Sequence, residues 1–187
     1  MELKEKILNG IACVYNEKGL NFTMDDVAKA VGMSKKTIYT VFRDKESMLL
    51  AMADYIFDSI KAEEQKIIED ESLSTIEKIR RILVVLPDGY QEVDFRQLYL
   101  LGDKYPEISK HVQMRLETGW ETTISLLEQG MKEGVVRNVR IPIVKMMVEN
   151  MLEQFVQQDA LIQNQIDYMD ALQELVSIIV DGIATRE

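Results

Sequence analysis

Apolar residues recur at intervals of three and four along most of this 187-residue chain, which is the spacing of one face of an α-helix. The first such stripe runs from Leu3 to Lys18 and ends at Gly19, a residue type that adopts the left-handed conformation after a helix without steric cost. The strict alternation typical of half-buried strands is sustained nowhere in the sequence. The pattern therefore predicts an all-α protein.

Helical spacing, capping residues and glycines divide the chain into about nine expected helices. The first three form a small N-terminal domain, residues 1–46, and the remainder, residues 47–187, forms a helical body. Because the fourth expected helix crosses this boundary without a break, the two domains are predicted to be joined by continuous helix. The expected ranges are 3–18, 23–31, 34–42, 45–69, 74–86, 94–103, 106–132, 143–162 and 167–184.

Residues 23–42 predict two short helices joined by a tight turn. Thr23 is a favourable N-cap residue, and Asp26, three positions later, completes a capping box. Gly32 permits the positive φ that a sharp turn needs, and Ser34 caps the second helix. This pattern is typical of a helix-turn-helix motif, whose second helix lies in the major groove of DNA.

The second helix of this motif exposes cationic and hydroxyl side chains, which suit contacts with DNA. Lysine can donate to guanine and threonine can bond to several bases, while Lys45 and the backbone amides at the start of the next helix suit a phosphate. An inert αα-hairpin is the alternative, but it has no need of a glycine turn together with outward basic residues. The expected DNA-binding residues are Thr23, Ser34, Lys35, Lys36, Thr37, Tyr39, Thr40 and Lys45.

The distribution of charge agrees with DNA contact at one end of the molecule. The net charge is −10, but residues 1–50 carry eight Lys/Arg against seven Asp/Glu, whereas residues 51–187 carry 14 against 25. DNA repels an acidic surface, so the N-terminal domain is the expected contact region.

The stretch from Ile7 to Met52 resembles the N-terminal domain of the TetR family of bacterial repressors. It carries the pattern TxxDVAKAVGMSKKTIYxxF followed by xDKExML. The resemblance implies three helices in a DNA-binding domain, followed by a helical domain for ligand binding and dimerisation. It also implies that Tyr39 contacts phosphate and that Lys45 matches the family's lysine at the start of the fourth helix. Many members have histidine where this chain has Val41, which puts one phosphate contact in doubt.

The last two expected helices are apolar over more than one face, and such helices need burial on more than one side. One side suits the subunit core and the other suits a second copy of the chain, in agreement with the resemblance. The alternative is a thick core within one subunit. A homodimer would place two recognition helices on a palindromic operator. The expected interface residues are Val148, Leu152, Phe155, Leu172, Leu175, Val176, Ile179 and Ile183.

Aromatic residues and methionines of the body could line a cavity for a small hydrophobic ligand, since methionine adapts to variable shapes. Each of these residues could equally be ordinary core. The acidity of the body gives a slight preference for a cationic ligand. The expected cavity residues are Arg96, Tyr99, Tyr105, Met114, Trp120, Met131 and Phe155.

Three further side-chain positions carry expectations that the structure can check. His111, the only histidine, is expected at the surface. Cys13, the only cysteine, lies near an apolar face and is expected to be a buried, unreactive thiol. The neighbouring Glu63 and Glu64 are expected on a solvated helix face.

The composition argues against an enzyme, because the sequence has one histidine, one cysteine, no glycine-rich phosphate loop and no GxSxG motif. No metal or cofactor is expected. No apolar run approaches the ~18 residues of a membrane span, and no signal peptide is visible, so a cytoplasmic protein is expected. The predicted function is that of a ligand-released, dimeric repressor. The alternative is a DNA-binding protein of the same fold that is controlled by a protein partner, or acts architecturally, without a small-molecule effector.

Overall fold

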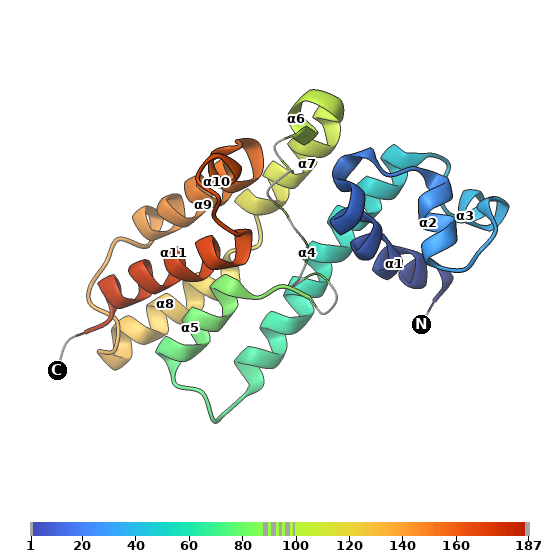
Figure 1. Ribbon diagram of the computed structural model, residues 1–187. Coiled ribbons are helices and arrows are strands. Elements are labelled where there is room, and N and C mark those ends of the chain that lie inside the picture. The colour runs from blue at the N-terminus through green and yellow to red at the C-terminus, as the bar shows by residue number, and fades with distance from the viewer. Residues whose placement is uncertain are drawn as a thin grey trace.

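The computed structural model describes residues 2–185 except 88, 89, 91, 92, 94, 96, 97 and 99. Within these residues the chain is helical and contains no β-strand, which confirms the all-α prediction. Figure 1 shows a small domain at one end, a larger helical body at the other, and one long helix that extends from the first into the second.

The N-terminal domain consists of α1 (Leu3–Lys18), a short 3-10 turn η1 (Gly19–Asn21), α2 (Met24–Ala30) and α3 (Lys35–Val41). Helix α1 packs against α2 and against the start of α4 (Lys45–Glu69), while α3 packs on α2. The centre of this domain is a set of fully buried apolar side chains. They are Ile7, Ile11, Val27, Ile38 and Met48.

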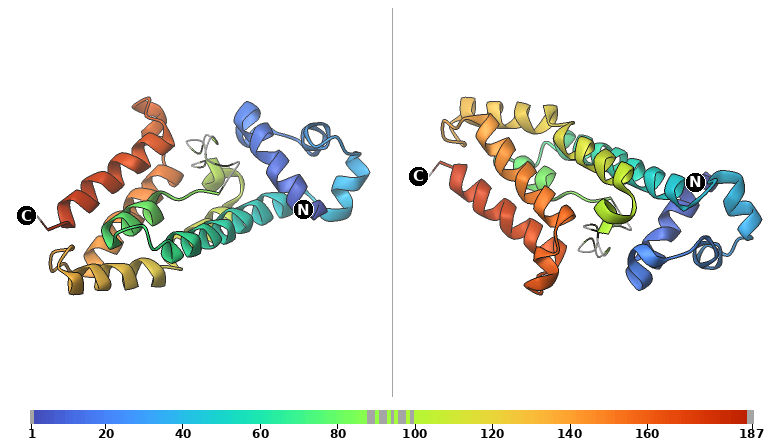
Figure 2. Two further views of the ribbon diagram at one scale, coloured as in Figure 1. Left: turned by 90° about the horizontal axis from the view of Figure 1, so that it is seen from below. Right: turned by 90° about the horizontal axis from the view of Figure 1, so that it is seen from above.

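Helix α4 has 25 residues, and at 1.5 Å per residue it spans about 37 Å. Both views in Figure 2 show α4 extending from the N-terminal domain along the body. The predicted continuous helical connection between the domains is therefore present.

The body is built from helices that pack around α5 and α11. Helix α5 contacts α4, α8 and α11, and α7 lies between α4 and α9 (Figure 1). An isolated antiparallel bridge joins Val136 to Ala184 and holds the end of the last helix. The bounds are α5 Thr75–Val84, α6 Leu100–Lys104, α7 Pro106–Glu117, α8 Glu121–Glu133, α9 Ile141–Gln157, α10 Ala160–Gln163 and α11 Tyr168–Ile183.

The single helix predicted for residues 106–132 is wrong, since the structure has two helices there. Gly119 has φ +81°, a left-handed conformation that ends the first helix and redirects the chain. The indole nitrogen of Trp120 donates to the carbonyl of Leu116 at 2.9 Å and covers the end of α7. The predicted helix 143–162 is also divided, into α9 and α10, and the predicted helix 94–103 lies partly outside the described residues.

Among the residues that the structure describes, no helix is both long enough and apolar enough to cross a membrane.

Candidate functional site

The first helix of the motif is fixed by a complete capping box. The hydroxyl of Thr23 accepts from the backbone N–H of Asp26 at 3.3 Å, and the Asp26 carboxylate accepts from the Thr23 backbone N–H and hydroxyl, both at 2.8 Å. Lys18 pairs with the same carboxylate at 2.5 Å. The Lys18 ammonium, followed by these two Thr23 bonds, holds the pKa of Asp26 far below its usual value. Asp26 therefore stays ionised and ties the start of α2 to the end of α1.

The turn between the two helices is the predicted glycine turn. Gly32 has φ +66°, and the backbone N–H of Met33 donates to the carbonyl of Ala28 at 2.9 Å. A Cβ at Gly32 would meet nothing within 4 Å, so a larger residue would be opposed by backbone conformation rather than by lack of space. The helix-turn-helix geometry is present as predicted.

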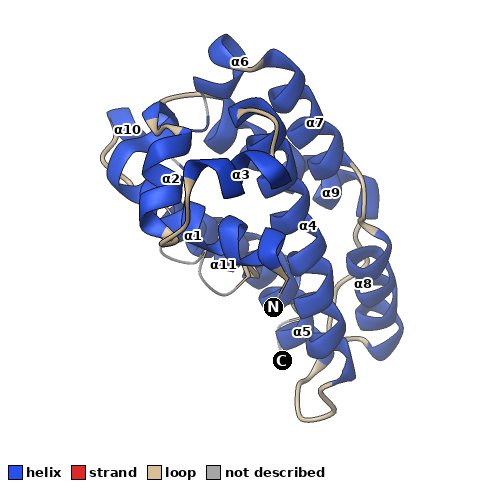
Figure 3. Cartoon of the chain, turned by 90° about the vertical axis from the view of Figure 1, so that its right-hand side faces the viewer, coloured by secondary structure: helices blue, strands red, loops and turns tan. Residues whose placement is uncertain are grey.

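The second helix, α3, presents its polar side chains to solvent. Figure 3 views the molecule from the side on which α2 and α3 face the reader. Ser34 accepts from the backbone N–H of Thr37 at 3.1 Å and so caps α3. The fully buried Ile38 fixes the helix against the domain core, while Tyr39 is 46% exposed.

The other polar side chains of α3 differ in how far they are already engaged. Lys35 pairs with Asp25 at 3.0 Å, and the hydroxyl of Thr40 donates to the Thr37 carbonyl at 2.6 Å. Lys36 is exposed and forms no hydrogen bond or ion pair within the described part of the chain. Lys36 and Tyr39 are therefore the side chains of α3 best placed to meet a new partner.

Lys45, predicted to contact a phosphate, is already engaged within the protein. Its ammonium donates to the carbonyls of Leu20 and Phe22, each at 2.6 Å, and lies 4.2 Å from the centre of the Phe22 ring. Burial lowers the pKa of Lys45. The side chain is thus committed to holding the α1–α2 connection against the start of α4.

The N-terminus of α4 is capped by Asp44. Its carboxylate accepts from the backbone N–H of Ser47 at 2.8 Å and pairs with Arg43 at 2.8 Å. The Ser47 backbone bond, with Arg43 and the Ser47 hydroxyl adding to it, lowers the pKa of Asp44 to about 2. The Asp44 carboxylate therefore occupies the start of α4, where the sequence predicted a phosphate.

A cavity of about 570 Å³ lies between α4, α5, α7, α9 and α11. This volume is within the ~300–1,000 Å³ range of small-molecule sites. Its wall is mainly apolar and extends from Leu20 of η1 to Glu64 near the far end of α4. The wall therefore includes a residue of the DNA-binding domain as well as residues of the body.

The predicted cavity residues are only partly brought together. Met114 and Trp120 line the cavity, whereas Arg96 and Tyr99 lie outside the described residues. Tyr105, Met131 and Phe155 do not line it. The Tyr105 ring lies 6.0 Å from the Lys45 ammonium, Met131 packs against the core, and Phe155 packs edge-on against Tyr168 at 6.2 Å.

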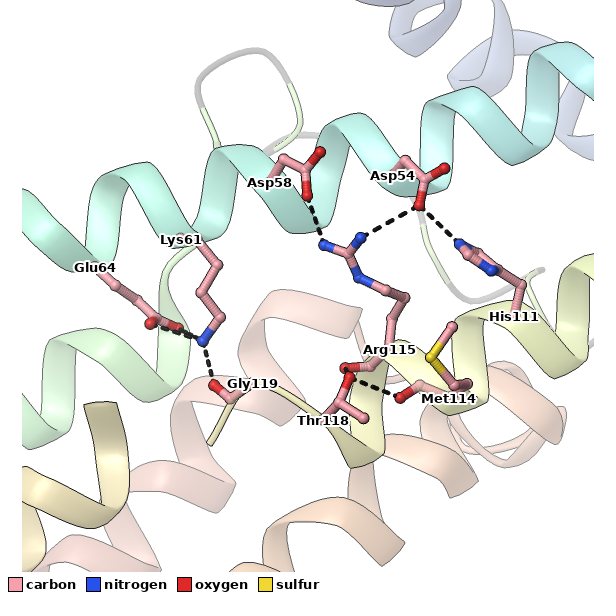
Figure 4. A network of polar contacts seen from close by, with 9 residues as sticks. All are labelled: Asp54, Asp58, Lys61, Glu64, His111, Met114, Arg115, Thr118 and Gly119. Carbon is pink, nitrogen blue, oxygen red and sulfur yellow. Dashed lines mark hydrogen bonds and ion pairs between the residues drawn. The ribbon is translucent and has the colours of Figure 1, made fainter. Parts of the chain in front are cut away.

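A polar network joins α4 to α7 beside the cavity, as Figure 4 shows. Asp54 pairs with the Nε2 of His111 at 2.7 Å and with Arg115 at 3.3 Å, and Arg115 also pairs with Asp58 at 2.7 Å. His111 lines the cavity, so the prediction of an ordinary surface histidine is wrong. These contacts clamp α7 onto the helix that continues into the DNA-binding domain.

One of the two neighbouring glutamates and the cysteine also differ from expectation. Glu64 is buried against the cavity and pairs with Lys61, while its neighbour Glu63 pairs with Lys66 on the outer side of α4. Helical periodicity could have separated these two glutamates, which point about 100° apart. Cys13 is exposed rather than buried.

The interface residues predicted on α9 and α11 contribute mainly to the core of the subunit. Val148, Phe155, Leu172, Val176, Ile179 and Ile183 are buried within the subunit, and Leu152 and Leu175 are half-buried. The opposite faces carry large apolar side chains that are between 40% and 65% exposed. This group, here named the outer apolar face, consists of Ile143, Met146, Met147, Met151 and Ile178.

Two short helices joined by a glycine turn, the second of them exposing basic and hydroxyl side chains, define a DNA-binding regulator of the helix-turn-helix class. Residues 7–52 match the family of bacterial regulatory proteins named tetR. This match confirms the resemblance of the N-terminal residues to the tetR family of regulators.

Similar proteins match this chain over nearly its whole length. The uncharacterized HTH-type transcriptional regulator YvaF of Bacillus subtilis is 24% identical over 185 residues, which cover 99% of this chain and 97% of that protein. A TetR transcription regulator from Haloarcula marismortui has the same fold, with TM-score 0.72, 14% identity and coverage of 97% and 98%. The regulator FadR from Bacillus subtilis, solved in complex with stearoyl-CoA, has TM-score 0.52, 17% identity and coverage of 96% and 98%.

Proposed function

We propose that this regulator is a homodimeric repressor that leaves a palindromic operator when a small molecule fills the cavity. The observation that carries the proposal is the shared wall of the cavity. Leu20 belongs to the DNA-binding domain and lines the same space as Ile82, Leu116 and Leu172 of the body. A ligand in that space would therefore contact both domains.

Few contacts separate the cavity from the elements of the DNA-binding domain. Leu20, which lines the cavity, also offers its carbonyl to Lys45 at the start of α4. Tyr90 of the body donates to the carbonyl of Leu8 in α1 at 2.8 Å, and Lys104 donates to the side chain of Asn21 at 2.8 Å. A ligand that moved α4 or Leu20 would change how these contacts hold the DNA-binding domain.

The fold neighbours support a ligand-binding role for the cavity. FadR from Bacillus subtilis was solved with stearoyl-CoA, so a protein of this fold can hold a large ligand with an apolar chain. At 17% identity that likeness concerns the fold. The ligand of this chain has to be inferred from its own cavity.

We infer that the outer apolar face forms the dimer interface. It lies on α9 and α11, and exposed apolar groups of this size on a monomer mark interaction surfaces. A two-fold axis through this face would pair two DNA-binding domains. Their recognition helices would then reach half-sites about one DNA turn apart, roughly 34–36 Å.

At each half-site we assign Lys36 and Thr37 to base edges and Tyr39 to a phosphate. Lys36 is the unengaged cation of α3 among the described residues, and Thr37 adjoins it on the first turn. Lys35, Thr40, Ser34 and Thr23 remain proposed DNA contacts, and we propose that Lys45 acts indirectly, by holding the start of α4. We also propose that the protein is not an enzyme and that it acts in the cytoplasm.

The assignment is tested by Tyr39→Phe and Lys36→Gln, compared on a panel of operator variants. Tyr39→Phe should weaken binding of the dimer to every duplex about a hundredfold or more, because it removes one hydrogen bond to a charged phosphate in each of the two subunits. Lys36→Gln should instead change the preferred base at one position by about 1–3 kcal/mol. Equilibrium binding measured by fluorescence anisotropy separates the two effects.

The control is Lys132→Gln, an equal change of charge on an exposed residue of α8 in the body. It should leave both affinity and base preference unchanged. If Tyr39→Phe and Lys36→Gln gave the same uniform loss, the division between phosphate and base contacts would be wrong. Operator binding that no small molecule affects would favour control by a protein partner.

A further inference from the structure

The far end of the cavity contains a buried carboxylate. Glu64 is 6% exposed and is the one buried charged residue in the described part of the chain. Its two oxygens accept from the ammonium of Lys61 at 3.0 and 2.8 Å, as Figure 4 shows. A buried carboxylate is costly unless a cation is paired with it, so this position in the wall requires a positive charge.

The lysine that supplies this charge is much less confined than the glutamate. The Lys61 side chain is 43% exposed, against 8% for that of Glu64. Lys61 also donates to the carbonyl of Gly119. The lysine stem passes close to this glycine, since a Cβ added to Gly119 would lie 2.9 Å from the Lys61 Cε. Lys61 can withdraw into solvent by rotation of its own side chain, whereas Glu64 cannot leave the wall.

The other ionic groups beside the cavity favour a cation over an anion. The Arg115 guanidinium already meets both Asp54 and Asp58. An anionic ligand would have to compete with these two carboxylates for Arg115. A cationic ligand would have to displace only Lys61 from Glu64.

The rest of the cavity wall is mainly apolar, and it follows the length of α4. Trp120 and Phe57 lie in the wall together with Glu64, and Leu20 and Leu49 lie at the other end. Leu49 and Glu64 are fifteen positions apart on α4, which corresponds to about 22 Å along the helix. The cavity therefore suits a ligand with a small charged head and a long apolar tail.

We propose that the cavity binds a cationic amphiphile whose ammonium head replaces Lys61 on Glu64 and whose tail extends along α4 toward Leu20. The effect on DNA rests on the function proposed above, but the choice of ligand class rests on the cavity alone. Cation–π attraction to Trp120, already approached by the Lys145 ammonium at 5.9 Å, would add to the binding of such a head.

The test uses the full-length protein and its single tryptophan, Trp120, which lines the cavity and serves as a fluorescent reporter. The protein is titrated at neutral pH with dodecylammonium, with the net-neutral dodecyldimethylamine oxide and with dodecanoate, all below their micelle concentrations. We expect the ammonium compound to bind about tenfold or more tightly than the other two, the value of one charge-assisted contact in a desolvated site.

Two variants separate the head contact from general hydrophobic binding. Glu64→Gln keeps the shape of the side chain and should abolish the preference for the ammonium compound. Lys61→Met removes the competing cation and should raise the affinity for it, with a larger ligand-induced rise in melting temperature. The matched control is Glu63→Gln on the same helix, which removes a carboxylate that pairs with Lys66 and does not line the cavity.

Equal binding of all three compounds, tighter binding of dodecanoate, or an unchanged preference in Glu64→Gln would overturn the proposal. If Glu64→Gln fails to fold, the Lys61→Met arm decides. Operator release is measured separately with the same compounds. Binding of the ammonium compound without release would leave the ligand class in place and contradict the proposed function, whereas release by dodecanoate alone would do the reverse.

Discussion

Replacement of Lys45 by methionine is expected to destabilise the DNA-binding domain by about 2–3 kcal/mol, the cost of leaving two partly buried carbonyls without their charged donor. Those carbonyls belong to Leu20 and Phe22, which form the connection between α1 and α2. The methionine keeps most of the apolar stem, so the loss reports the ammonium. Urea unfolding followed by circular dichroism measures the change.

Operator binding should weaken in this variant because the domain is less often folded. Excess DNA should therefore recover part of the lost stability, since a ligand of the folded state stabilises it by mass action. The control is Lys36→Met, which removes an exposed lysine from α3 and should leave the unfolding free energy within about 0.5 kcal/mol of the parent. If Lys45→Met were as stable as the parent and yet failed to bind DNA, Lys45 would contact phosphate directly.

The second large effect is expected from a charge placed in the outer apolar face. Met147→Asp puts a carboxylate on α9 where the partner's apolar surface should cover it, and the two-fold axis repeats the change in the other subunit. An unpaired charge in a desolvated interface costs several kcal/mol. Dimerisation should weaken about a hundredfold or more, and sedimentation velocity would show a folded monomer.

Two further variants distinguish this face from the residues that sequence periodicity selects. Ile179 lies in the subunit core. Ile179→Ala should therefore lower the free energy of unfolding by about 2–5 kcal/mol, and with it the melting temperature, but leave the dimer assembled. Ser125→Asp adds the same charge to an exposed position of α8 and should change neither property. A Met147→Asp protein that remains dimeric would place the interface elsewhere.

The features that the sequence predicted well are those set by neighbouring residues. The capping box at Thr23, the glycine turn at Gly32 and the cap at Ser34 depend on hydrogen bonds and backbone conformations within four or five positions. The uninterrupted α4 was predictable for the same reason, because its cap at Asp44 and its apolar spacing are local signals.

The features that were missed depend on which elements meet in space. Periodicity shows that a face of α9 or α11 is buried, but Val148 and Met147 carry similar signals although one lies in the core and the other outside. In the same way, a lysine at the start of a helix does not show in sequence whether it faces a phosphate or the carbonyls of Leu20 and Phe22.

The cavity illustrates the same limit. Phe155 and Trp120 are both large aromatic residues at helical spacing, and only Trp120 lines the space. The prediction of a solvated face for Glu64 is wrong, since chain that lies far away in the sequence packs beside it, as the bond from Lys61 to the Gly119 carbonyl shows. A buried carboxylate could have been suspected from its position, one helical turn after the apolar Ile60.

The central claim is that this chain is a dimeric, sequence-specific DNA-binding regulator, and the most direct test is selection of random duplexes on purified protein stripped of small molecules. The selection is run at ~150 mM salt, which suppresses purely electrostatic binding. The account predicts enrichment of a palindrome whose half-site centres lie about one DNA turn apart, roughly 34–36 Å. Absence of any enriched sequence, or enrichment of isolated half-sites without symmetry, would contradict it.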